Sequence, residues 1–257
     1  CQDPALLRQG TFRFLGQTAS LHDLQYDRVH ELDVDHLWRF HLHYQEYLFD
    51  LLKFTDQQPH AGLNRFRECG PGDPHYSSQG SDPCCASQQR LSAAGLRPNE
   101  GDGDGEFANV GSKGLITRTD PWSFVARWIE LFPGPTSATL QDAWHPFCIS
   151  RRIPVWMMLW HSRETEWLCP DGMQAPFLES LASQAEFLHR NLELDLGGNH
   201  LLENLRALVL AAAFLDCPQA DAWLCTADRY LRRELPQQCL ATGEHFERAP
   251  AYHAIVL

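Results

Sequence analysis

Apolar residues recur at helical spacing in six segments of the chain. In residues 35–54, "DHLWRFHLHYQEYLFDLLKF", the apolar and aromatic positions are three or four residues apart, which places them on one face of a helix. Glycine- and proline-rich turns such as "FPGPT" and "DLGGN" separate the segments. The same spacing predicts five further helices, at about residues 121–132, 146–162, 174–193, 200–215 and 219–235. The pattern therefore predicts a mostly α-helical protein.

Two regions depart from the helical pattern. Residues 10–16, "GTFRFLG", could form one strand or an extended arm. Residues 57–118 are rich in Gly, Ser, Pro, Asp and Gln and contain few aliphatic side chains. Because such a segment can bury little apolar surface, it is predicted to be a disordered or poorly packed insertion. Residues 1–56 and 119–257 are then two parts of one helical domain that the insertion interrupts.

Composition and charge narrow the class of protein. The 257 residues are 44% hydrophobic, which is enough to fill a large globular core. A formal net charge of -12 argues against a general nucleic-acid or anionic-membrane partner. No apolar run is long enough to cross a bilayer. The chain starts without Met or a signal-like core and stops inside the apolar "AYHAIVL", so it is expected to be a fragment of a longer protein.

No stretch of the sequence fits a metal or cofactor site. The nine cysteines show neither a regular disulfide spacing nor a CxxC pair, so buried or incidental thiols are expected. "EGDGDGEF" resembles the start of a calcium loop, but the twelfth position counted from Glu100 is Gly111, where a bidentate Glu is needed. "HLH" at residues 41–43 is helical by pattern, so its two rings point apart. The sequence therefore predicts no metal and no cofactor in this chain.

Four polar side chains stand where the turn of "LGGNHLLENL" becomes a helix: Asn199, His200, Glu203 and Asn204. Polar groups beside so apolar a helix need partners or a function. Asn199 could cap the helix, because it follows two glycines, or it could contact a ligand. His200 lies one helical turn from Glu203 and Asn204, which allows either a satisfied core pair or an oriented catalytic imidazole. Both alternatives are open on the residues alone.

Two more segments combine charged and aromatic residues. Residues 142–156, "DAWHPFCISRRIPVW", could form a sugar-stacking platform with carboxylate-binding guanidiniums, from Trp144, His145, Arg151 and Arg152. Equally, Trp144 could belong to the core. Residues 243–257, "GEHFERAPAYHAIVL", form either a solvated loop or a second site, with Glu244, His245, Glu247, Arg248, Tyr252 and His253.

Five stretches together resemble a known family. "FRFLG", "LWRFHLHYQEYL", "AWHPFCISRRI", "NLELDLGGNHLLENLRALVLAAAFL" and "GEHFERAPAYHAIVL", in this order, are similar to the N-terminal helical half of the heparinase II/III-like polysaccharide lyases, whose relatives include alginate lyases. The resemblance covers residues 11–56 and 119–257. It implies an incomplete (α/α) toroid, followed in complete relatives by an antiparallel β-sandwich that is not in this chain. It also favours a periplasmic or secreted location.

The resemblance implies β-elimination at a uronic acid of an acidic polysaccharide, of the heparin or heparan type or of the alginate type. Asn199 would bind the substrate carboxylate, and His200 would help to neutralise it or serve as the base. Tyr252 would act as the acid and could also act as the base, with positive charge supplied by Arg248 or His253. The other expected substrate-binding residues are Trp144, His145, Arg151, Arg152 and Glu203. The oligomeric state is left open.

Two rival functions remain. A glycoside hydrolase on the same toroid would need two carboxylates flanking a glycosidic bond, for which Asp195, Glu203, Glu244 and Glu247 are candidates. A non-catalytic glycan-binding module would need neither an acid nor a base. Elimination leaves an unsaturated, ultraviolet-absorbing sugar end, whereas hydrolysis and binding do not.

Overall fold

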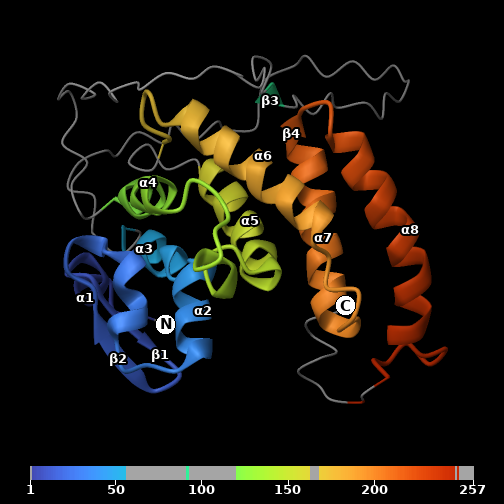
Figure 1. The fold of residues 1–257 in the computed structure, drawn as a ribbon, viewed down its shortest axis with the longest axis horizontal. Helices are drawn as coiled ribbons and strands as arrows, with labels where there is room; N and C mark the ends of the chain where they lie inside the picture. The colour runs from blue at the N-terminus through green and yellow to red at the C-terminus, as the bar shows by residue number, and fades with distance from the viewer. Residues whose placement is uncertain (1, 56–90, 93–119, 163–167, 247, 249–257) are drawn as a thin grey trace, which may run out of the picture.

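The computed structural model describes residues 2–55, 91–92, 120–162, 168–246 and 248. Helices make up most of these residues, which confirms the mostly α-helical prediction (Figure 1). Apart from residues 91–92, the insertion predicted for residues 57–118 lies outside the described residues. No helix in the described ranges is both long and apolar enough to cross a membrane.

The N-terminal residues form a β-hairpin beside short helices. Its turn is made by Leu15 and Gly16, whose φ angles of 53° and 82° suit the twist of a two-residue hairpin. Residues 11–14 are thus a strand, as one reading of residues 10–16 predicts, but the sequence pattern does not predict the partner strand. The elements of this region are α1 (Pro4–Arg8), β1 (Thr11–Phe14), β2 (Gln17–Ser20) and the 3-10 helices η1 (His22–Leu24) and η2 (Tyr26–Glu31).

The prediction of a single helix over residues 35–54 is wrong, because the segment forms two helices, α2 (His36–Tyr44) and α3 (Leu48–Thr55). At the break Gln45 takes a left-handed φ of 59°, which is strained for a residue other than glycine. Gln45 is fully buried, and its side-chain oxygen accepts a hydrogen bond from Trp156 Nε1 at 2.7 Å. This tertiary contact holds the break, and the break turns Glu46 toward the Arg151 side chain.

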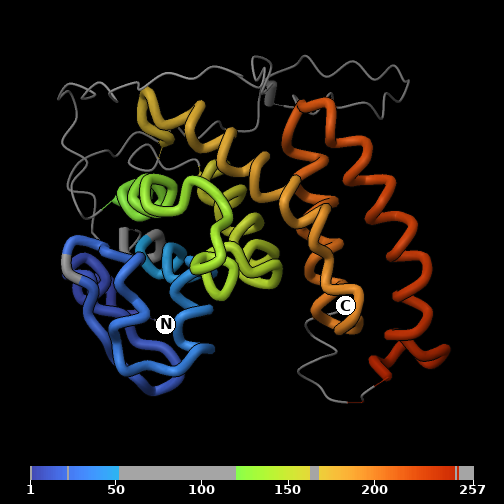
Figure 2. Tube along the Cα trace, in the orientation of Figure 1, coloured from blue at the N-terminus to red at the C-terminus, as the bar shows by residue number. Residues whose placement is uncertain are grey.

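The other five helices confirm the predicted segments, with ends shifted by a few residues. They are α4 (Pro121–Leu131), α5 (Pro146–Trp160), α6 (Gln174–Arg190), α7 (Gly198–Phe214) and α8 (Ala220–Gln238). Helix α5 lies at the centre and packs on α2, α6 and α7, while α7 packs on α8 (Figure 1). The chain trace shows α7 and α8 side by side and running in opposite directions (Figure 2). Three small elements complete the described residues: η3 (Thr139–Gln141), β3 (Leu91–Ser92) and its parallel partner β4 (Leu215–Asp216).

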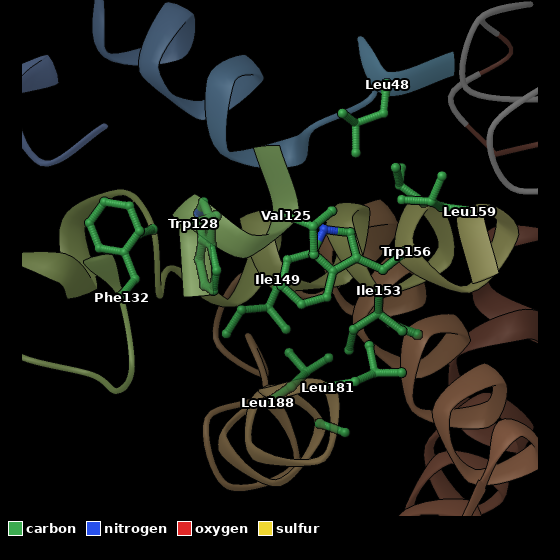
Figure 3. Close-up of a cluster of buried hydrophobic side chains, with 14 of the residues drawn as sticks. Leu48, Val125, Trp128, Phe132, Ile149, Ile153, Trp156, Leu159, Leu181 and Leu188 are labelled. Atoms are coloured by element: carbon green, nitrogen blue, oxygen red, sulfur yellow. The ribbon is translucent and has the colours of Figure 1, made fainter. Parts of the chain in front are cut away.

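Buried tryptophans dominate the core. Figure 3 shows its centre, where side chains of α4 and α5 meet those of α6. Trp128 and Trp156 pack edge to face, with ring centroids 5.5 Å apart, a preferred aromatic geometry. Six tryptophans are almost completely buried: Trp38, Trp122, Trp128, Trp144, Trp156 and Trp223. This packing fixes α5, the helix that carries Arg151, relative to its neighbours.

Candidate functional site

The start of α7 depends on two glycines. Gly197 (φ 60°, ψ -152°) and Gly198 (φ 55°) have backbone angles that residues with a Cβ atom rarely adopt. Gly197 is the N-cap residue, and it has no side chain that could cap the helix. Asn199 therefore lies inside the first turn, so its interpretation as a helix cap is wrong. Within the described part of the chain no hydrogen bond engages the Asn199 side chain, which lines a cavity instead.

His200, the next residue, is held by a carboxylate from the preceding loop. Its Nδ1 lies 3.1 Å from Glu193 Oε1, and its ring packs on Phe147 with centroids 4.3 Å apart. Its partner is thus not Glu203 or Asn204, the partners that helical spacing suggests. A carboxylate beside Nδ1 favours a proton on that nitrogen, which leaves Nε2 as the acceptor.

Asn204 fixes Glu193 in turn. Its Nδ2 donates to Glu193 Oε2 at 2.9 Å, and its Oδ1 accepts from the backbone N–H of Glu193 at the same distance. Asn204 Nδ2 also donates to Ser150 Oγ at 2.8 Å, which ties the loop to α5. Because Asn204 and Glu193 are both buried, this network has little freedom to move. The orientation of the His200 ring is therefore built into the fold.

An ion-pair chain runs beside this end of α7. Arg151 Nε donates to Glu46 Oε1 at 2.9 Å, and Arg151 Nη1 donates to Glu203 Oε1 at 3.0 Å. Arg206 Nη2 lies 2.6 Å from the other oxygen of Glu203. Burial opposes the charged form of Arg151, but Glu46 and Glu203 outweigh it and raise the pKa of the guanidinium. Two helices and the α2–α3 break thus meet in one charged cluster.

Three cavities adjoin this cluster. The central cavity, of about 250 Å³, has Asn199, Glu46 and Arg151 in its wall. It shares Glu46 and Arg151 with a larger cavity of about 480 Å³, which reaches the N-terminal hairpin. It shares Asn199 and Glu203 with a third cavity of about 270 Å³, between α7 and α8. The three cavities are thus neighbours, and Arg151 lies in the wall shared by the central and the larger one.

Two ionisable side chains of α2 also line the central cavity. Burial raises the pKa of Tyr44 well above its usual value, so the phenol stays protonated at neutral pH. Burial lowers the pKa of His41, which therefore stays neutral there. Tyr44 cannot be recognised as a site residue from the sequence, because its position matches the apolar face of its helix.

The platform predicted for residues 142–156 is wrong in part. Trp144 is 1% exposed and donates from Nε1 to the Phe132 carbonyl at 3.3 Å, so it belongs to the core. His145 is the N-cap of α5, where its Nδ1 accepts from the Phe147 N–H at 3.2 Å, and burial lowers the pKa of His145. The cap occupies Nδ1 only and His145 is half-buried, so its expected contact with substrate remains a prediction.

Arg152 is the second correction in that segment. Its side chain is completely buried and lies over the Trp128 ring, 3.9 Å from the centroid. It donates to Gln184 Oε1 at 2.8 Å and to the carbonyls of His43 and Ala143 at 2.8 and 2.9 Å. Arg152 therefore joins α2, α5 and α6. Of the two adjacent arginines, Arg151 lines cavities described above and Arg152 does not.

The second predicted cluster is only partly described. His245 is buried, with Nε2 at 3.0 Å from Gln238 Oε1, while Arg248 is exposed and lies 3.4 Å from Glu244. Tyr252 and His253 lie outside the described residues, as does Glu247. Their roles remain predictions.

Glu193 and Glu46 are two further site residues that are not among the candidates predicted from the sequence. Glu193 is seven residues before its partner, across the glycine turn, so no helical spacing connects them. Glu46 had a signal: it is the only acidic residue in the segment 36–49, which is otherwise rich in apolar and aromatic residues. A lone acid in such a segment needs a partner, and Arg151 provides it.

One family model matches the chain. Neither a curated protein nor a solved structure matches the chain. A family model described as the heparinase II/III N-terminus matches residues 119–257, which include Asn199, His200 and Arg151. This stretch is more than half of the 257 residues. The chain belongs to the heparinase II/III family.

Proposed function

We propose that this protein is a polysaccharide lyase that cleaves a uronic-acid-containing polysaccharide, of the heparan or alginate type, by β-elimination. Membership of the heparinase II/III family supports the reaction class. The observation that carries the proposal is the pair at the start of α7. Asn199 lines the central cavity without an intramolecular hydrogen bond among the described residues, and the neighbouring His200 is oriented by Glu193.

The chemistry explains why both residues are needed. The C5 proton of a uronate is weakly acidic, so the adjacent carboxylate must be neutralised before a base removes it. The Asn199 amide would donate a hydrogen bond to that carboxylate. With Nδ1 directed at Glu193, His200 would present Nε2 as the base. When the other epimer is cleaved, the doubly protonated ring would instead donate from Nε2 as a second neutralising group. Electrons from the C5–H bond then form the C4–C5 double bond as the C4–O bond breaks.

The leaving oxygen needs a proton, and Tyr252 is the proposed donor. This assignment rests on the family resemblance, with Arg248 or His253 as the neighbouring positive charge. We propose no cofactor for the chain, so a chelator should leave its activity unchanged.

We also propose that the helices belong to an incomplete (α/α) toroid. In such a fold successive helices form antiparallel hairpins, and α7 and α8 form one (Figure 2). The segment between them, residues 215–219, is short enough to keep the two helices adjacent.

The hydrolase alternative has weaker support. Glu203 has one oxygen 3.0 Å from Arg151 and the other 2.6 Å from Arg206, so neither is free to face a glycosidic bond. Asp195 is exposed and Glu244 is half-buried, both lie on loops, and neither lines a cavity described above. A hydrolase also needs no carboxylate neutraliser, so it leaves Asn199 unexplained.

The product distinguishes these functions. The full-length protein is incubated with heparan-type and alginate-type polymers, and new reducing ends and ultraviolet absorbance are followed together. Equal growth of both signals supports elimination. New reducing ends without absorbance would establish hydrolysis, and binding without either signal would establish a glycan-binding module.

A further inference from the structure

Arg151 presents two different edges to its two carboxylate partners. The edge with Nη1 faces Glu203 at 3.0 Å. The edge with Nε and Nη2 faces Glu46, and both N–H groups of this edge go to the same oxygen, Oε1. This second edge is the one that can hold a carboxylate through two parallel hydrogen bonds, one to each oxygen. A single oxygen of Glu46 therefore occupies the edge of Arg151 that could bind both oxygens of a carboxylate.

The two carboxylates differ in how easily they can leave. The Glu203 side chain is 4% exposed and also pairs with Arg206, so its departure would leave buried charges without partners. The Glu46 side chain is 37% exposed and can return to water at little cost. Exchange at Arg151 is thus restricted to the edge that Glu46 covers.

The space beside that edge suits a polymer. Glu46 and Arg151 form the shared wall of the central cavity, of about 250 Å³, and the larger cavity, of about 480 Å³. Asn199 lines the central cavity as well. A ligand that places one carboxylate at Asn199 and continues along the cavities passes the Glu46 side of Arg151. In a polymer with repeated uronates, a second carboxylate is available there.

We propose that Arg151 is a second carboxylate subsite, which the Glu46 side chain occupies until a uronate carboxylate of the polysaccharide displaces it. The identity of the ligand rests on the proposed function. Glu46 then acts as an internal competitor that weakens binding, while Glu203 keeps the guanidinium in place. A residue that merely held Arg151 in position would have the opposite effect, because its loss would weaken binding. The sign of the change therefore decides between the two roles.

The test is the affinity of Glu46→Gln for a hexasaccharide of alternating glucuronate and N-acetylglucosamine and for an alginate-type hexauronate. Calorimetry is done in a His200→Ala background, which limits consumption of the ligand. Gln has nearly the same shape but lacks the charge that competes. The dissociation constant for a bound ligand should fall about three- to tenfold, the range expected for removing one partly exposed competing ion pair. Glu46→Ala should change it in the same direction, even if it melts at a lower temperature.

Two controls isolate the effect. Glu130→Gln removes the same charge from α4, where Glu130 pairs with Arg127 at 2.7 Å and lines none of the described cavities, so it should leave the affinity unchanged. Adding Arg151→Lys to Glu46→Gln should abolish the gain, because an ammonium lacks the fork of donors. Unchanged or weaker binding by both Glu46 variants overturns the subsite. Loss of the proposed function shows separately, as failure of the unmodified protein to cleave any uronate polymer.

Discussion

Replacing Glu193 by Gln tests whether His200 works as an oriented imidazole. Glu193 faces His200 Nδ1 with one oxygen and accepts from Asn204 Nδ2 with the other, at 3.1 and 2.9 Å. Gln has the same shape, but its single oxygen must face Asn204, which leaves its NH2 group facing the ring. The ring then has to accept at Nδ1, so its proton moves to Nε2. The nitrogen proposed to take the substrate proton is blocked.

The two consequences of this change differ in size. A base in the wrong tautomer should lower kcat by about 10²–10⁴-fold, the range for lost general base catalysis. Stability should fall by only about 1–2 kcal/mol, because charge-assisted hydrogen bonds become neutral ones without loss of packing. In a chain of this size that corresponds to a lowering of Tm by a few °C. Most molecules stay folded, so the loss of activity cannot be attributed to unfolding.

The assay is formation of the unsaturated product at saturating substrate, with the folded fraction measured by circular dichroism on the same samples. Nitrogen-15 NMR of the His200 ring reports directly which nitrogen carries the proton. Glu234→Gln is the matched control, since Glu234 is 6% exposed but lies on α8, where it pairs with Arg233 at 2.9 Å. A folded Glu193→Gln protein with kcat within threefold of the unmodified protein would refute the assigned role of Glu193.

Three further predictions follow from the same structure. Asn199→Ala should change the free energy of unfolding by no more than about 0.5 kcal/mol, since no cap is lost. It should nevertheless lower turnover by at least about 10²-fold. Intact turnover would exclude a role of Asn199 in neutralising the carboxylate. Tyr252→Phe should lower kcat by about 10²–10⁴-fold while the control Tyr230→Phe on α8 does not, and equal rates for all three proteins would remove Tyr252 from the mechanism. Burial lowers the pKa of His43 to about 3, so its neutral form stabilises the fold above pH 6.5 and that stability is lost as the pH falls. His43 should therefore lower the free energy of unfolding, measured with denaturant, by up to about 2 kcal/mol at pH 5. A His43→Asn variant whose free energy of unfolding falls as steeply between pH 7 and pH 5 would contradict this.

The helices could be predicted because each buries an apolar face, and burial imposes a spacing that the sequence records. Helices α4 to α8 follow this rule. Gln45 breaks the predicted helix 35–54 although the apolar spacing continues across it. Its left-handed angle is held by Trp156, more than a hundred residues away, and no local pattern records such a contact.

The parts of the site that consist of residues adjacent in the sequence could be predicted. Asn199 and His200 are adjacent, and the two glycines before them mark the turn that the structure shows. Glu193 was not predictable, because its link to His200 depends on how that turn folds back. Arg151 lies in a cavity wall, whereas its neighbour Arg152 is buried in the core. Their environments differ because successive residues of a helix point about 100° apart.

The contacts of α5 with residues 43–46 also bear on how the protein can be divided. Arg152 reaches the His43 carbonyl, Trp156 reaches Gln45, and Arg151 reaches Glu46, so one helix recognises three points of a short stretch of chain. The covalent connection between the two segments raises the local concentration of one near the other, and these contacts hold them together. Residues 2–55 supplied as a separate polypeptide should therefore restore the site to a chain that begins at residue 120, and such complementation in trans would allow each half to be labelled or varied independently.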